Sequence, residues 1–154
     1  SFLEENDILF EIVPGITSGI AASSYFGIPL THRNGASTVT FVTGHESSEK
    51  KEKNVNWRQL AYASDSLVIY MGIRNIEFIV EELLTGGMKP TTRCAVVQEA
   101  TLNNQKSLIT ELSKLSKEIK EKYIKPPAII IIGKIVDFKV NNNITKLSSV
   151  ILRN

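Results

Sequence analysis

Cysteine and histidine are scarce in this 154-residue chain, which contains one cysteine and two histidines. A single thiol cannot form an internal disulfide. Cys94 lies in an apolar run, so we predict a buried structural thiol in a reducing compartment. The two histidines and the cysteine are too widely separated to form a metal-ligand motif, and we expect no metal.

An excess of charge is also lacking, because the net charge is only +2. This charge is too small to indicate nucleic acid or an anionic membrane as a partner, and we expect neither. No apolar run approaches the length of a membrane span and no secretory signal is evident, so we expect a cytoplasmic protein without membrane contact. The glycine-rich motifs of dinucleotide and nucleoside triphosphate sites are absent, as is the nucleophile elbow of hydrolases.

Alternating strand-like and helix-like patterns are present along most of the chain. They predict an α/β sandwich in which helices cover both faces of a sheet. The apolar run 128–132 has no polar alternation, which is typical of a central strand buried on both faces. The predicted strands are 8–13, 39–43, 67–71, 94–99, 107–110 and 128–136, and the predicted helices are 16–26, 57–63, 73–84 and 112–123.

The segment 13–22 is the most informative part of the sequence. Pro14-Gly15 interrupts the first predicted strand with a fixed φ followed by a permissive one. Thr17 and Ser18 then stand at the start of the predicted helix. Their hydroxyl groups either cap the helix or contact a ligand, and this motif alone favours the cap.

Small residues follow the ends of three predicted strands, where ligands collect in open α/β sheets. A glycine or alanine there would let a ligand touch the backbone. The pair His32-Arg33 either closes an apolar turn or pairs with a carboxylate-rich ligand. The residues alone therefore indicate a small-ligand α/β domain. The strand ends are Gly44-His45, Met71-Gly72 and Ala100-Thr101.

Several ordered motifs resemble the tetrapyrrole methylase family. They are Val-Pro-Gly-Ile-Thr-Ser at 13–18, Gly-Ile-Pro-Leu-Thr-His-Arg at 27–33 and Phe-Val-Thr-Gly-His at 41–45. Residues 67–72 and 127–136 continue the match in the family's order, so that the resemblance covers about residues 8 to 138. The Thr-His-Arg and Val-Thr-Gly-His pieces resemble the members that methylate uroporphyrinogen III.

This resemblance implies a mixed-sheet αβα sandwich, the C-terminal domain of a homodimeric methyltransferase that binds S-adenosyl-L-methionine between two domains. It implies methylation of uroporphyrinogen III at C2 and C7 to give precorrin-2, on the route to sirohaem and cobalamin. Met71 matches a residue that touches both cofactor and substrate. His32 and Arg33 are weaker matches for groups that bind the substrate's carboxylates. The positions that match the family's cofactor contacts are Thr17, Ser18, Met71, Ala100 and Ala128.

The family's Gly-x-Gly-Pro-Gly-Asp and Gly-Gly-Asp segments, and its proposed acid/base residues, have no counterpart in this sequence. We therefore expect residues 1–15 to be a connection from an N-terminal domain, 16–138 to be the C-terminal domain and 139–154 to be a tail or linker. We also expect little or no methylation by this chain alone. Two alternatives stay open: another methyltransferase of the family, or a non-catalytic dimerisation or regulatory module of the same fold.

Overall fold

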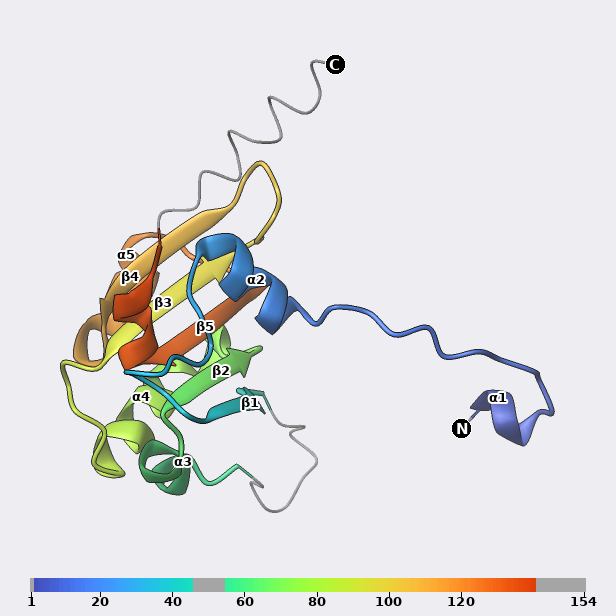
Figure 1. The fold of residues 1–154 in the computed structure, drawn as a ribbon, viewed down its shortest axis with the longest axis horizontal. Helices are drawn as coiled ribbons and strands as arrows, with labels where there is room; N and C mark the ends of the chain where they lie inside the picture. Colours follow the sequence, from blue (N-terminus) through green and yellow to red (C-terminus); the bar gives the residue numbers. More distant parts are fainter. Residues whose placement is uncertain (1, 46–54, 141–154) are drawn as a thin grey trace.

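The computed structural model describes residues 2–45 and 55–140 of the chain. Within them, a five-stranded sheet has the strand order β1-β2-β5-β3-β4 (Figure 1). β1 and β2 are parallel and the other neighbouring pairs are antiparallel, so the sheet is mixed, as the resemblance implied. The strands are β1 (Val39–Thr43), β2 (Ser66–Tyr70), β3 (Arg93–Gln98), β4 (Lys106–Glu111) and β5 (Ala128–Gly133).

The predicted central strand is confirmed. β5 lies between β2 and β3, and its Ile130, Ile131 and Ile132 side chains are fully buried. The strand ends earlier than predicted, at Gly133, which has φ 144°. A Cβ atom on Gly133 would lie 2.4 Å from the carbonyl oxygen of Asp65, so only glycine fits this turn. A short 3₁₀ segment, Lys134–Phe138, follows.

Helices cover both faces of the sheet (Figure 1). On one face, α3 (Trp57–Ala63), α4 (Ile76–Thr85) and α5 (Leu115–Glu121) pack on a core that includes Leu67 and Ile69. On the other face, α2 (Ser18–Phe26) and the segment Lys134–Phe138 pack on a core that includes Val68 and Ile131. The two cores separate because successive side chains of a strand point to opposite faces.

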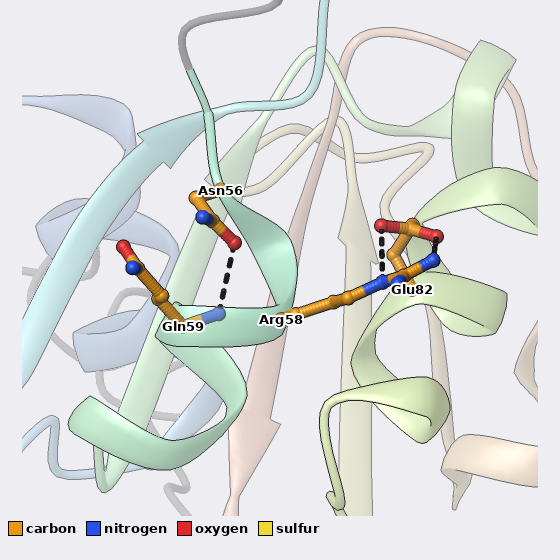
Figure 2. A network of polar contacts seen from close by, with 4 residues as sticks. All are labelled: Asn56, Arg58, Gln59 and Glu82. Atoms are coloured by element: carbon orange, nitrogen blue, oxygen red, sulfur yellow. Dashed lines mark hydrogen bonds and ion pairs between the residues drawn. The ribbon is translucent and has the colours of Figure 1, made fainter.

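The α3 helix has the bounds that the sequence predicted. Asn56 caps it, because its side-chain oxygen accepts a hydrogen bond of 3.1 Å from the backbone N–H of Gln59 (Figure 2). Arg58 extends from the first turn to α4, where its Nε and Nη2 donate to the two carboxylate oxygens of Glu82 at 3.0 and 2.8 Å. This bidentate contact links neighbouring helices on one face.

The other helices begin later than predicted. The predicted helix 16–26 starts at Ser18. The predicted helices 73–84 and 112–123 each open with a 3₁₀ turn, which a short α-helix then continues. Such turns are common at helix ends, and periodicity alone does not distinguish them from α-helix.

The strand predicted at 8–13 is wrong. After α1 (Phe2–Glu5), the chain continues to residue 17 without regular structure and runs away from the sheet (Figure 1). Leu9 is 98% exposed and Ile12 is 82% exposed. Within the described residues no strand lies beside this segment, so its backbone groups have no ladder partner.

Most of the predicted tail 139–154 lies outside the described residues, which end at Val140. The backbone N–H of Val140 donates to the carbonyl oxygen of Gly27 at 2.8 Å, so the described chain ends against the turn after α2. In the described part of the chain, none of the helices has the length and hydropathy to span a bilayer.

Candidate functional site

A cavity of about 610 Å³ lies at the edge of the sheet where β2 and β3 end and β5 begins. Because β5 is antiparallel to both neighbours, its first residue, Ala128, pairs with the last residue of β3, Gln98. This is the edge at which the sequence predicted a ligand. The volume is in the usual range for small-molecule sites. The lining is mainly apolar and comprises Ser18, Tyr70, Met71, Ile73, Val97, Glu99, Ala100, Leu102, Pro126, Pro127, Ala128 and Ile129.

Four of the residues predicted to bind a cofactor line this cavity together. Ser18 comes from the start of α2, Met71 directly follows β2, Ala100 lies in the loop after β3 and Ala128 begins β5. The fifth, Thr17, does not line the cavity itself. Its Oγ1 lies 2.7 Å from the hydroxyl oxygen of Tyr70, which does.

Gly19 allows the start of α2 to approach β2 closely. A Cβ atom on Gly19 would lie 2.4 Å from the Tyr70 hydroxyl oxygen and 2.8 Å from Cγ1 of Val68. Thr17 occupies the N-cap position of α2, but its side chain does not cap the helix. The hydroxyl contact with Tyr70 instead ties the helix start to the strand end.

Met71 has a left-handed backbone, with φ 52°, and its side chain is 61% exposed. The neighbouring glycines were predicted to offer backbone to a ligand, and this was wrong. Gly44 and Gly72 are buried against each other, because a Cβ atom on Gly44 would lie 2.5 Å from Cα of Gly72. The backbone N–H of Gly44 donates to the carbonyl oxygen of Tyr70 at 2.6 Å. The glycines therefore serve to join the ends of β1 and β2.

Glu99 also lines the cavity, and sequence reasoning missed it. It was assigned to the predicted strand 94–99, whereas β3 ends at Gln98 and Glu99 turns to φ 49°. Its backbone N–H donates to the carbonyl oxygen of Pro127 at 3.0 Å. Its Oε2 accepts hydrogen bonds from Nε2 of Gln98 at 3.2 Å and from Nδ2 of Asn104 at 2.7 Å. The only signal in the sequence was a charged residue directly after an apolar strand.

His32 and Arg33 are not brought to the cavity. The His32 ring stacks on Phe138, with ring centroids 3.9 Å apart. The same segment continues to Ser37, whose N–H donates to Asp65 just before β2. His32 and Arg33 therefore lie toward the edge where β1 and β2 begin, opposite the cavity, and their role in binding carboxylates stays a prediction.

Cys94, the single cysteine of the chain, lies in β3. Cys94 is fully buried in β3, as predicted, and burial raises the pKa of its thiol far above the usual value. Its Sγ lies 3.5 Å from the carbonyl oxygen of Thr92. Within residues 2–45 and 55–140, His, Cys, Asp and Glu form no group that could hold a metal ion.

Residues 1–116 match the family model for tetrapyrrole (corrin/porphyrin) methylases. A uroporphyrinogen-III C-methyltransferase of Bacillus subtilis is 45% identical over 136 residues, which are 88% of this chain and 52% of that protein. An S-adenosyl-L-methionine-dependent uroporphyrinogen III methyltransferase of Methanosarcina barkeri is 40% identical over 134 residues, 87% of this chain and 52% of that protein.

A solved structure is similar too. It is a uroporphyrin-III C-methyltransferase from Thermus thermophilus in complex with S-adenyl homocysteine, with a TM-score of 0.73 and 29% identity. The match covers 88% of this chain and 57% of that one. This chain thus spans about half the length of the relatives that it matches.

Proposed function

The chain belongs to the tetrapyrrole methylase family, and we therefore propose that it carries the cofactor-binding C-terminal part of a uroporphyrinogen-III C-methyltransferase. The cofactor would be S-adenosyl-L-methionine, the substrate uroporphyrinogen III, and the product precorrin-2, formed by methylation at C2 and C7. The observation that carries this proposal is the cavity that Ser18, Met71, Ala100 and Ala128 line together.

The residues of the cavity fit a nucleoside thioether. Its apolar walls suit an adenine ring, and the Ser18 and Tyr70 hydroxyl groups suit the polar groups of a ribose. Ala100 and Ala128 have small side chains that leave the cavity open, whereas larger ones would fill it. The left-handed backbone of Met71 holds its thioether side chain at the rim, exposed to whatever lies beyond the sheet edge.

When bound, S-adenosyl-L-methionine supplies an electrophilic methyl group on a sulfonium. The part of this chain in the reaction is to hold and orient. The apolar walls would exclude water from the reacting centre, and the fixed positions of Met71 and Tyr70 would direct the ligand toward the substrate. For well-oriented reactants, such positioning reaches effective molarities of about 10⁵–10⁸ M.

The remaining parts of the proposal concern the whole protein. Residues 1–15 would connect to an N-terminal domain that supplies the acid/base residues, 16–138 would form the C-terminal domain, and 139–154 would be a tail or linker. His32 and Arg33 would bind substrate carboxylates. We further propose a homodimer that works in the cytoplasm.

The test uses the protein expressed from its complete reading frame, incubated with S-adenosyl-L-methionine and uroporphyrinogen III under reducing conditions. We expect mass spectrometry to show a tetrapyrrole that has gained two methyl groups. The 154-residue chain assayed in parallel should convert little or none. Methylation of a different tetrapyrrole in place of uroporphyrinogen III would overturn the substrate assignment. Failure of the complete protein to bind S-adenosylhomocysteine in calorimetry would overturn the cofactor assignment.

A further inference from the structure

Glu99 is the only charged residue among the described residues that line the cavity. The remaining lining side chains are aliphatic, prolyl, thioether, hydroxyl or phenol groups. A carboxylate beside an apolar wall is stabilised when a cation or several hydrogen-bond donors contact it. The surroundings of this carboxylate therefore indicate what kind of ligand group the cavity accepts.

One carboxylate oxygen is already satisfied by the protein. Oε2 accepts from the amide groups of Gln98 and Asn104, at 3.2 and 2.7 Å. Gln98 is itself fixed, because its Oε1 accepts from the backbone N–H of Lys125 at 2.7 Å. Both donors are neutral, so they orient the carboxylate and leave its charge in place.

The other oxygen, Oε1, has no such partner among the residues that the structure describes. In residues 2–45 and 55–140, no hydrogen bond or ion pair reaches Oε1 of Glu99, and no lysine, arginine or histidine lines the cavity. The backbone holds the residue firmly, since its N–H donates to Pro127 and its φ is 49°. Among the described residues, the carboxylate at the wall of this mainly apolar cavity therefore has two neutral amide donors and no cationic partner.

We propose that Glu99 is a specificity-determining residue that binds a positively charged group of the methyl donor, an inference that rests on the proposed function. Oε1, which has no partner among the described residues, is the atom that makes the contact. S-adenosyl-L-methionine has two cationic groups, its sulfonium and its amino-acid ammonium. S-adenosylhomocysteine keeps only the ammonium, and adenosine has neither. These three ligands therefore distinguish the two sources of positive charge.

The experiment measures the Kd of all three ligands by calorimetry with the complete protein and with its Glu99→Gln variant. Glutamine keeps the shape of the side chain and an oxygen that accepts from Gln98 and Asn104, but it removes the charge. Glu81→Gln, on the exposed surface of α4, makes the same change of charge away from the cavity and is the matched control. Thermal unfolding confirms that each variant is folded.

We expect Glu99→Gln to raise the Kd of S-adenosyl-L-methionine at least about tenfold and to leave the Kd of adenosine unchanged. The control Glu81→Gln should change neither Kd. A loss of affinity for S-adenosyl-L-methionine alone assigns the contact to the sulfonium. An equal loss of affinity for S-adenosylhomocysteine assigns the contact to the ammonium. Unchanged affinity for all ligands, or an equal loss for adenosine, would overturn the inference. If the unmodified protein binds none of the three, the proposed function fails, and that result is visible before any variant is made.

Discussion

The hydroxyl oxygens of Thr17 and Tyr70 lie 2.7 Å apart, across 53 positions of sequence. Thr17 precedes α2 and Tyr70 ends β2, so this single contact fixes the start of a helix to the carboxyl end of a strand. Tyr70 also lines the cavity. The contact therefore links the position of the start of α2 to the shape of the candidate site.

Tyr70→Phe should weaken ligand binding and lower stability slightly. The substitution removes one hydrogen bond, which is worth about 1 kcal/mol. Chemical denaturation should therefore show a free energy of unfolding lower by about that amount, and calorimetry should show a higher Kd for S-adenosylhomocysteine. Tyr62→Phe, at a side chain that is 93% exposed, is the control and should change neither quantity. An unaltered Kd in Tyr70→Phe would mean that the contact does not shape the site.

Gly19→Ala should destabilise the protein by about 1–3 kcal/mol, the usual cost of overpacking. The added methyl group would lie 2.4 Å from the Tyr70 hydroxyl oxygen and 2.8 Å from Cγ1 of Val68, so either these side chains or α2 must shift. Gly15→Ala is the matched control, because a Cβ atom there meets nothing within 4 Å. Equal unfolding midpoints for the two variants would show that α2 adjusts to the extra methyl group without strain.

Ala100→Leu and Ala128→Leu should abolish or strongly weaken binding of S-adenosylhomocysteine while the protein stays folded. Both alanines line the cavity and are partly exposed, although each also packs against a core, so larger side chains would occupy the cavity and thermal unfolding must confirm the fold. We expect at least about a tenfold increase in Kd, which corresponds to about 1.4 kcal/mol. Ala63→Leu, exposed at the end of α3, should bind as the unmodified protein does. Normal affinity in both cavity variants would place the ligand elsewhere.

Asp65 should contribute a specific acid sensitivity to folding. Its carboxylate accepts from the N–H groups of Ser37 and Thr38 at 2.8 and 3.0 Å, and these hydrogen bonds hold its pKa below the ordinary value. The unfolded chain has the ordinary pKa of about 3.9. The stabilisation is therefore present above about pH 4 and is lost as the pH falls through the lower, folded pKa.

The Asp65→Asn variant tests this pH dependence. It should be less stable than the unmodified protein at pH 7, and the difference should shrink as the pH is lowered below 4. Asp7→Asn, on the exposed segment before the sheet, serves as the control. A difference between Asp65→Asn and the unmodified protein that is constant from pH 7 to pH 2.5 would contradict the assignment.

The sequence predicted the core elements well where local and tertiary preferences agree. The strand 39–43 and the helix 57–63 have the predicted bounds, because β-branched residues define the first and the Asn56 cap defines the second. The segment 8–13 carries an equally strong strand pattern but lies exposed. An apolar pattern shows that a segment suits a sheet, whereas a strand also needs a neighbouring strand.

The candidate site was predicted in part for a similar reason. Met71 and Ala100, which line the cavity, were predicted because they follow strands and match family motifs, and Ala128, which also lines it, was predicted from the family match alone. Glu99 was missed because its left-handed backbone and its contact with Asn104 exist only once the loop 99–105 has folded back on itself. A pattern of apolar and polar residues does not predict such a reversal of the chain.

The central place of β5 has a consequence for synthesis of the chain. This strand is the last of the described sheet to leave the ribosome, yet it joins β2 to β3. Until residues 128–133 emerge, the β1–β2 pair and the β3–β4 pair are separate units, each with an unpaired apolar edge. Nascent chains that stop before residue 128 therefore expose two unpaired strand edges and lack the complete sheet. Such incomplete chains are therefore prone to aggregate until residues 128–133 have been translated.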